Sequence, residues 1–134
     1  MPLQKQISVF LPNRPGLLAR ICGVLSEAGV NILALSIHDT IDNAVVRLVL
    51  DDPMKGILLL ENEDFFVTEQ DVVVLGVNNE PGVLARIAQC LGRADINIEY
   101  AYCTAAPDQP TGCIVVKTRE PERTLECLRE FEFG

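Results

Sequence analysis

A short motif that suits the binding of an anionic ligand occurs twice in the chain. Residues 13–21 read Asn-Arg-Pro-Gly-Leu-Leu-Ala-Arg-Ile, and residues 79–87 read Asn-Glu-Pro-Gly-Val-Leu-Ala-Arg-Ile. The Pro-Gly pair directly precedes an apolar pattern with helical spacing, and the start of a helix presents free backbone N–H groups with a partial positive charge. An Asn side chain both donates and accepts hydrogen bonds. Together these groups suit a small molecule that carries a carboxylate.

The glycine of the motif has two possible explanations. Glycine is a poor helix former, so its presence at the start of a helix needs a reason. Either a ligand approaches the backbone closely at Gly16 and Gly82, or glycine only lets the helix pack tightly against a strand. The residues alone leave both explanations open.

The motif belongs to a longer internal repeat that divides the chain. Residues 13–32 and 79–98, which are 66 positions apart, are identical at 11 of 20 aligned positions. A chain of 134 residues is ordinarily one domain. The repeat instead predicts two small units, residues 1–69 and residues 70–134. Units of this size are near the lower limit of independent stability, so we expect them to fold and pack together.

Both units show the same order of predicted elements. Asn13 and Asn79 are expected to cap a helix with proline in its first turn, and Gly29 is expected to end the first helix. Each unit is then a ferredoxin-like βαββαβ unit of the α+β class, an antiparallel sheet with both helices on one face. The second unit is expected to lack its last strand. The predicted elements are strands 5–11, 30–38, 44–50 and 65–68 with helices 15–28 and 53–62, then strands 72–77, 96–104 and 113–117 with helices 81–94 and 121–131.

Several predicted strands are apolar on both faces. A sheet of this kind needs more cover than two helices on one face supply. We therefore expect the units to pack closely and the chain to form a homodimer. In strand 30–38, simple alternation places Ile32, Ala34 and Ser36 on one face and Leu33, Leu35 and Ile37 on the other.

Composition and charge argue against several classes of function. Hydrophobic residues make up 49% of the chain and charged residues 22%, which is typical of a globular protein with a core. The net charge is −8 and no run of Lys or Arg occurs, so nucleic acid and anionic membranes are poor partners. No apolar run approaches the length of a membrane span, and no signal peptide precedes the first strand. We expect a cytoplasmic protein.

The residues offer little for catalysis or metal binding. His38 is the only histidine, and the chain has no phosphate loop, nucleophile elbow or dinucleotide fingerprint. We expect no enzyme activity, no catalytic residue, no metal site and no cofactor. Glu99 is interpreted as a surface carboxylate rather than a ligand for an amino group. The five cysteines lack paired spacing and are interpreted as free thiols in a reducing compartment; they are Cys22, Cys90, Cys103, Cys113 and Cys127.

The pattern Asn-x-Pro-Gly-x-Leu, followed about fifteen residues later by Asn-Ile, resembles the ACT domain, a small regulatory module of amino-acid-metabolising enzymes. Both halves match, so the whole chain resembles a stand-alone tandem ACT protein. In that family a small ligand, most often a free amino acid, binds at interfaces between ACT units, against the strand-to-helix loop and the start of the second strand. The ligand-binding positions that the resemblance implies are Asn13, Arg14, Pro15, Gly16, Leu17, Asn31 and Ile32, with Asn79, Glu80, Pro81, Gly82, Val83, Asn97 and Ile98.

The chain departs from the family pattern in one informative way. Serine-binding members carry a His two residues before the loop Asn, where this chain has Leu11 and Val77. The resemblance therefore implies a different or more apolar ligand, or a site that is empty. Arg14 and Glu80 occupy the same place in the two loops, so we expect two chemically distinct sites, or one working site and one inactive site.

The first hypothesis is a protein that binds a free amino acid and, by changing conformation or assembly, regulates a separate enzyme or regulator of amino-acid metabolism. The alternative is a structural subunit that dimerises and scaffolds an enzyme complex without sensing. An enzyme is the third and weakest hypothesis, because no acid, base or nucleophile converges in the pattern.

Overall fold

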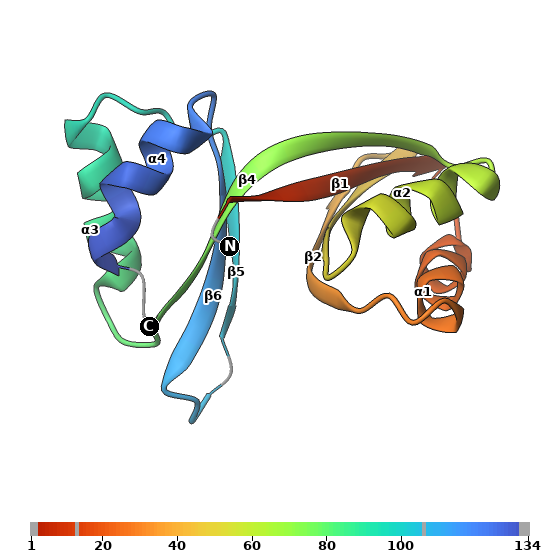
Figure 1. Ribbon diagram of the computed structural model, residues 1–134, viewed down its shortest axis with the longest axis horizontal. Coiled ribbons are helices and arrows are strands. Elements are labelled where there is room, and N and C mark those ends of the chain that lie inside the picture. Colours follow the sequence, from red (N-terminus) through yellow and green to blue (C-terminus); the bar gives the residue numbers. More distant parts are fainter. Residues whose placement is uncertain (1–2, 13, 106, 132–134) are drawn as a thin grey trace. The chain divides into compact units, whose positions relative to one another are not determined.

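The computed structural model describes residues 3–12, 14–105 and 107–131 of the chain. Its elements follow the βαββαβ order in the first half and the βαββα order in the second, so the predicted α+β fold is confirmed (Figure 1). Within the described residues, no helix is long and apolar enough to cross a membrane. The strands are β1 (Leu3–Pro12), β2 (Ile32–Asp39), β3 (Asn43–Leu50), β4 (Phe66–Asn78), β5 (Tyr100–Ala105) and β6 (Thr111–Lys117). The helices are α1 (Leu17–Glu27), α2 (Pro53–Asn62), α3 (Val83–Arg93) and α4 (Pro121–Leu128), followed by the short 3-10 helix η1 (Arg129–Phe131).

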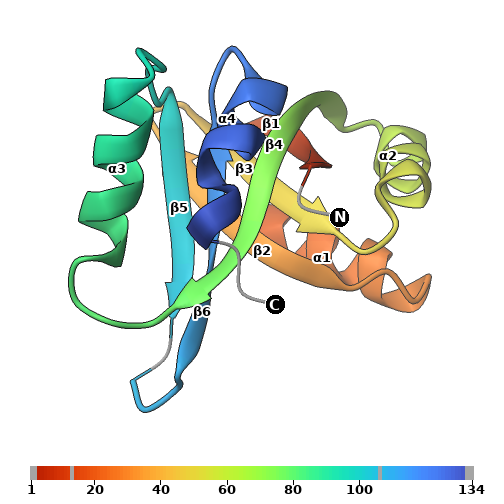
Figure 2. The same ribbon diagram turned by 60° about the vertical axis from the view of Figure 1, so that its left-hand side comes forward.

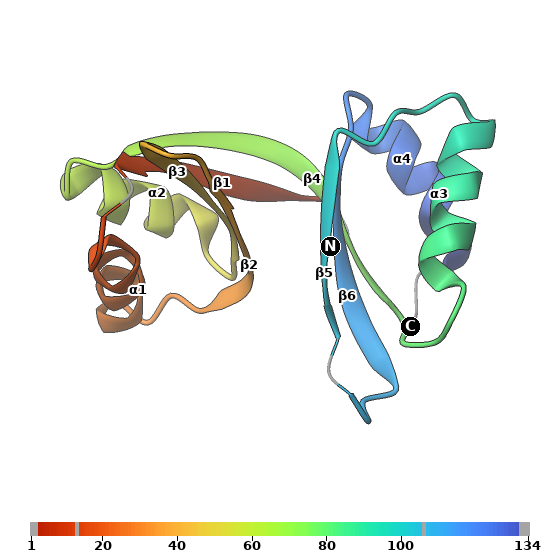
Figure 3. The same cartoon turned by 180° about the vertical axis from the view of Figure 1, so that it is seen from behind.

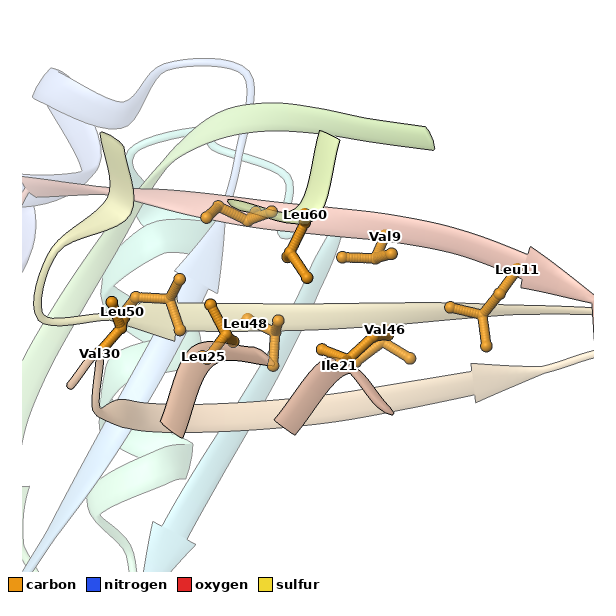
Figure 4. Close-up of a cluster of buried hydrophobic side chains, with 10 residues drawn as sticks. Val9, Leu11, Ile21, Leu25, Val30, Val46, Leu48, Leu50 and Leu60 are labelled. Carbon is orange, nitrogen blue, oxygen red and sulfur yellow. The ribbon is translucent and has the colours of Figure 1, made fainter. Parts of the chain in front are cut away.

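One compact unit comprises Lys5–Gln70. Its strands lie in the order β2-β3-β1-β4, and β3 pairs antiparallel with both β1 and β2. The helices α1 and α2 lie on one face of this sheet (Figure 1). Alternate strand residues and the apolar sides of the helices meet in a buried core, because side chains alternate along a strand and recur every third or fourth residue along a helix (Figure 4). The core consists of Ile7, Val9, Leu11, Ile21, Leu25, Val30, Val46, Leu48, Leu50 and Leu60.

The other compact unit comprises Asp71–Gly134 together with Met1–Gln4. Its strands lie in the order β4-β6-β5 with antiparallel pairing, and α3 and α4 cover one face (Figure 3). No strand follows α4 in the part of the chain described, as the sequence predicts. Leu3, at the start of β1, packs against the core of this unit. That core consists of Val73, Leu75, Val77, Val83, Ile87, Leu91, Ile96, Ile114, Val116 and Leu128.

The strand β4 runs without a break for 13 residues (Figure 2), whereas the sequence predicts two shorter strands here. The polar residues in its middle suggest an interruption, but the fold gives one of them partners. The Gln70 Oε1 atom accepts hydrogen bonds from Ser8 Oγ at 2.8 Å and from Gln6 Nε2 at 3.1 Å. Both partners are buried side chains of β1. Contacts with another strand therefore keep a locally polar segment extended.

An irregularity in β2 changes the predicted faces of that strand. The pairing with β3 shifts between Ile32 and Ala34, which is the signature of a β-bulge. The extra residue turns Ile32 toward the helices, where it packs against the core. The prediction that Ile32 shares a face with Ala34 is therefore wrong, because simple alternation does not account for a bulge.

The C-terminal ends of α1 and α3 are capped in the same way. Lys55 Nζ donates a hydrogen bond to the Ala28 carbonyl at 2.8 Å, and Arg123 Nη2 donates one to the Ala94 carbonyl. The next residue has a left-handed backbone in both places, with a φ of 76° at Gly29 and a φ of 60° at the residue that replaces it, Asp95. The expected helix end at Gly29 is confirmed.

Replacing Asp95 by glycine should raise the free energy of unfolding by about 1 kcal/mol, because glycine adopts the left-handed backbone without steric cost. Urea unfolding of the Asp95→Gly variant checks this. The matched variant in the first unit, Gly29→Ala, should lower the free energy of unfolding by a similar amount. If the Asp95→Gly variant is instead less stable, the aspartate side chain stabilises the fold by more than the left-handed backbone at this residue destabilises it.

Candidate ligand site

The helices α1 and α3 begin directly after the glycine of the repeated motif. Gly16 has φ 90° and ψ −16°, and Gly82 has φ 90° and ψ −10°. This left-handed backbone is natural for glycine and rare for other residues. A Cβ at Gly16 would meet no atom within 4 Å. The required backbone conformation, rather than tight packing on a strand, therefore explains the glycine.

This geometry corrects two expectations about the motif. Pro15 and Pro81 lie in a turn before each glycine, outside the helix and not in its first turn. Gly82 occupies the N-cap position that the sequence assigns to Asn79, and Gly16 occupies the corresponding position of α1. Asn13 itself lies outside the described residues. The cause of both errors is the same: the left-handed glycine starts each helix two residues later than periodicity suggests, at Leu17 and at Val83.

The first turns of α1 and α3 are free to hold an anion. Among the residues described, no side chain caps either helix, and neither first turn contains an acidic residue. The first helical hydrogen bonds run from Arg20 N to Gly16 O and from Arg86 N to Gly82 O, at 3.0 Å each. The N–H groups of the residues in between lie outside the helical ladder. In α3 one of them, Val83 N, donates a long hydrogen bond of 3.5 Å to the Glu80 carbonyl. These N–H groups give each start a partial positive charge.

The other two helices lack this property. Asp52 caps α2, and its Oδ1 accepts a hydrogen bond from Lys55 N at 3.2 Å. In α4, Glu122 lies in the first turn, where its negative charge offsets the helix dipole. The contrast separates α1 and α3, which follow the repeated motif, from α2 and α4, which do not.

The side chains of the two loops have different surroundings. Asn79 Nδ2 donates to the Gln109 carbonyl at 2.9 Å, which holds the loop to the connection between β5 and β6. Glu80 Oε1 lies 3.5 Å from Arg86 Nη2. In the first unit the exposed Arg14 takes the place of Glu80. The first loop therefore carries a cation where the second carries an acid–base pair.

Within each unit, the predicted asparagine that precedes the second strand lies far from the loop. Asn31 and Asn97 follow the C-terminal end of a helix of 11 residues, so about 16 Å of helix separates them from the glycine at its start. Asn31 N donates to Asp51 Oδ1 at 2.9 Å. Ile32 and Ile98 are half-buried against the cores of their units. A single unit does not bring Asn31 or Asn97 to its own loop.

A cavity of about 110 Å³ lies beside the second loop. Asn79, Glu80 and Val83 line it, and among the predicted residues whose structure is described only these do so. Pockets for small ligands commonly have about 300–1,000 Å³, so this cavity can hold part of a ligand at most. The other residues of its wall were not predicted. Three of them lie in or next to the motif in sequence, and strand pairing brings the other four there from β5 and β6. The unpredicted residues of the wall are Val77, Asn78, Leu84, Cys103, Thr104, Gly112 and Cys113.

An apolar hollow of about 220 Å³ continues from this cavity between α3 and β5. Leu84 and Cys103 line both spaces, and Ile98 lines the hollow. Asn97 lies elsewhere, in a hollow of about 310 Å³ that also includes Arg119. The second unit therefore presents an apolar wall next to the start of α3, and Ile98 is the predicted second-strand residue that contributes to it.

The titratable groups near the second unit have structural roles. Lys117 Nζ donates a 2.7 Å hydrogen bond to Glu99 Oε1 and holds the pKa of that carboxyl below its usual range. Burial raises the pKa of the Cys113 thiol. The pairing supports the interpretation of Glu99 as a surface carboxylate. In the residues that the structure describes, no group of three or more His, Cys, Asp or Glu side chains could hold a metal ion.

Comparison with known proteins agrees with this architecture. A family model described as an ACT domain pair matches residues 1–133. No curated protein matches the chain. A solved structure of a protein from Bacteroides thetaiotaomicron is 31% identical with a TM-score of 0.89, and the alignment covers 96% of this chain and 88% of that chain.

Two solved regulatory subunits of aspartate kinase also resemble the chain. The ligand-free subunit from Thermus thermophilus is 18% identical with a TM-score of 0.69, over 94% of this chain and 91% of that chain. The subunit from Thermus flavus is 16% identical with a TM-score of 0.63, over 96% of this chain and 94% of that chain. At these identities the likeness is one of fold.

Proposed function

The chain belongs to the ACT domain pair family, and from this premise we propose that it is a regulatory protein that binds a free amino acid. Binding changes its conformation or its assembly, and this change controls a separate enzyme or regulator of amino-acid metabolism. Residues 1–69 and 70–134 each serve as one ACT unit. The protein acts by differential binding and not by catalysis. Its free cysteines favour a reducing, cytoplasmic setting.

The observation that carries this proposal is the pair of uncapped helix starts. Both Gly16 and Gly82 turn the chain so that the first N–H groups of a helix lie outside the helical ladder, without a side-chain cap or an acidic neighbour in the first turn among the residues described. The α-carboxylate of an amino acid is a natural partner for such groups. The same arrangement occurs at both copies of the motif and at neither of the other helices.

The walls of the second site favour a small apolar ligand side chain. Val77, Val83 and Leu84 line the cavity beside the α3 start. Leu11 and Val77, which stand where serine-binding members carry His, are buried core residues and offer no polar group to a serine hydroxyl. The two sites are not equivalent, because Arg14 strengthens the positive charge of the first loop while Glu80 weakens that of the second.

A homodimer would complete each site. The cavity is too small for a whole ligand, and the second-strand positions Asn31 and Asn97 lie at the far end of their own helices. We propose that a second copy of the chain supplies the missing wall. The edge strand β2 supports a dimer, because its apolar residues Leu33, Leu35 and Ile37 are 48%, 36% and 47% exposed.

The proposal predicts that one amino acid, or a few similar ones, will raise the melting temperature of the purified chain. A ligand present at a hundredfold excess over its Kd stabilises the folded state by about 2.7 kcal/mol. A thermal-shift screen of the twenty amino acids measures this, with size-exclusion chromatography to follow assembly. If no amino acid changes either the melting temperature or the assembly state, the proposal is wrong.

Glycine variants then locate the site. Gly16→Ala and Gly82→Ala force a left-handed backbone on alanine, so each should cost about 1–2 kcal/mol of stability and should also weaken or abolish the ligand-induced shift at its own loop. The matched controls are Gly23→Ala and Gly92→Ala, since these helical glycines have open space for a Cβ. The controls should keep the full ligand-induced shift. Equal ligand affinity in all four variants would remove the two loops from the site.

If no amino acid changes the melting temperature in the screen, the alternative function, a structural subunit that does not sense amino acids, is favoured. The exposed apolar edge of β2 also suits a subunit that only dimerises and scaffolds an enzyme complex. In that case the chain should remain an intact dimer whatever amino acid is added, and it should purify with a fixed protein partner. Leu35→Lys should break the dimer under either function, because it places a charge on the exposed edge.

A further inference from the structure

Two cysteines meet on neighbouring helices of the second unit. Cys90 lies on α3 and Cys127 on α4, and the two helices run side by side (Figures 1 and 3). Cys90 Sγ donates a hydrogen bond to the Cys127 carbonyl oxygen at 3.2 Å. Both residues are half-buried and pack against the core of the unit. Cys90 Sγ is thus in contact with the residue that carries the second thiol, which is the kind of placement that a disulfide between two packed helices requires.

In the first unit, the two positions that correspond to Cys90 and Cys127 hold aliphatic side chains. Val24 of α1 aligns with Cys90 at the offset of 66. The connection between β5 and β6 is two residues longer than that between β2 and β3, so the offset beyond it is 68, and Leu59 of α2 aligns with Cys127. Val24 and Leu59 are half-buried and pack against the first core. Ordinary aliphatic side chains therefore satisfy the packing between the two helices. The second unit has a thiol on both sides of the same contact, which packing alone does not require.

A hollow gives a small oxidant access to this pair. A cavity of about 590 Å³ opens beside Cys90, and Arg86 and Arg93 line it together with Gln89 and Glu130. Two guanidinium groups suit an oxidant that carries carboxylates. Burial, followed by the nearby Cys127 and Glu130, raises the pKa of the Cys90 thiol, so its thiolate is scarce and reaction should be slower than at the exposed Cys103.

We propose that Cys90 and Cys127 form a reversible disulfide that ties α3 to α4, and that the oxidant is a small carboxylate-bearing disulfide of the glutathione type. The Cys90 thiolate attacks one sulfur of the oxidant, which forms a mixed disulfide and releases one thiol. The Cys127 thiolate then attacks Cys90 Sγ and releases the second thiol. Two protein thiols are oxidised while one small disulfide is reduced to two thiols, and their protons pass to the released thiolates. This inference does not depend on amino-acid binding.

The full chain, oxidised with excess oxidised glutathione and then alkylated, tests the proposal. Trypsin cleaves after Arg86, Arg93, Arg123 and Arg129, so Cys90 lies on peptide 87–93 and Cys127 on peptide 124–129, and neither peptide contains another cysteine. Mass spectrometry should find these two peptides joined by a disulfide, and dithiothreitol should separate them. The exposed Cys103 should carry glutathione instead.

The variant Cys127→Ala supplies the matched control, since it removes the second thiol but keeps the site open. Glutathione should then remain on Cys90 as a stable mixed disulfide in this variant and should be absent from Cys90 in the natural chain. Two outcomes overturn the proposal: glutathione persisting on Cys90 of the natural chain without a link to Cys127, or both thiols staying unmodified while Cys103 reacts.

Discussion

Replacing Leu128 by alanine should lower the free energy of unfolding by about 2–5 kcal/mol. Leu128 is the last residue of α4, it has no exposed surface, and it lies in the core of the second unit. The alanine removes buried methyl groups and leaves a space that the surrounding strands cannot close. Leu60 of α2 occupies the same place in the first unit and is equally buried, so Leu60→Ala should have a similar effect. Urea unfolding measures both.

The control for this comparison lies two residues before Leu60 in the same helix. Leu58 is 65% exposed, and Leu58→Ala should change the free energy of unfolding by less than about 0.5 kcal/mol. A domain of ordinary stability has about 5–15 kcal/mol in total, so either core variant would consume a large part of it. A loss below 1 kcal/mol for both core variants would contradict the packing described for the two units.

Replacing Gly56 by threonine should be the second most damaging change, at a cost of about 1–3 kcal/mol. Gly56 is buried in α2, and a Cβ there would lie 2.3 Å from Leu50 Cδ1. Ile7 and Leu25 lie 3.5 Å and 3.6 Å from the same point, so Leu50 has little room to move aside. The better helix propensity of threonine offsets only a few tenths of a kcal/mol.

The second unit shows how this cost can be relieved. Thr118 and Thr124 align with Leu50 and Gly56, and their hydroxyl oxygens are 2.7 Å apart in a buried hydrogen bond. The first unit fills the space with the large side chain of Leu50 beside Gly56, which has no side chain. The second unit fills it with two medium side chains, those of Thr118 and Thr124. The double variant Leu50→Thr with Gly56→Thr should therefore be less destabilised than the sum of the single variants, by about 0.5–3 kcal/mol. Strict additivity would mean that Leu50 is not what resists a side chain at position 56.

The fold could be predicted from the sequence because its signals are local and repeated. Alternation and helical periodicity identified the elements of both units, and the repeat at residues 13 and 79 identified their number. The glycine that ends α1 followed from its position after the last apolar residue. These signals depend on one segment at a time, and the physics of each segment agrees with the fold around it.

The failures concern features that depend on other segments or on backbone torsion. The bulge at Leu33 alters pairing with β3 and leaves no mark in the alternation of β2. Gln70 stays in a strand because buried residues of β1 bond to it. Glycine permits the left-handed torsion of Gly16 and Gly82, but the presence of a glycine does not by itself predict that torsion.

The candidate site was predictable in part. The motif located the loops, and Asn79, Glu80 and Val83 do line a cavity. The walls that strand pairing adds, such as Thr104 and Cys113, could not be inferred from their distance in sequence. The resemblance also grouped Asn97 with the loop, although within one unit the whole length of α3 separates them.

The placement of Leu3 bears on how the chain could have evolved. A duplicated gene ordinarily yields two copies, each of which can be lost or exchanged alone. Here the opening residues of the first copy are built into the core of the second. Deleting or exchanging the first copy would remove an apolar side chain from the core of the second, so we expect the two halves to be kept together as a pair.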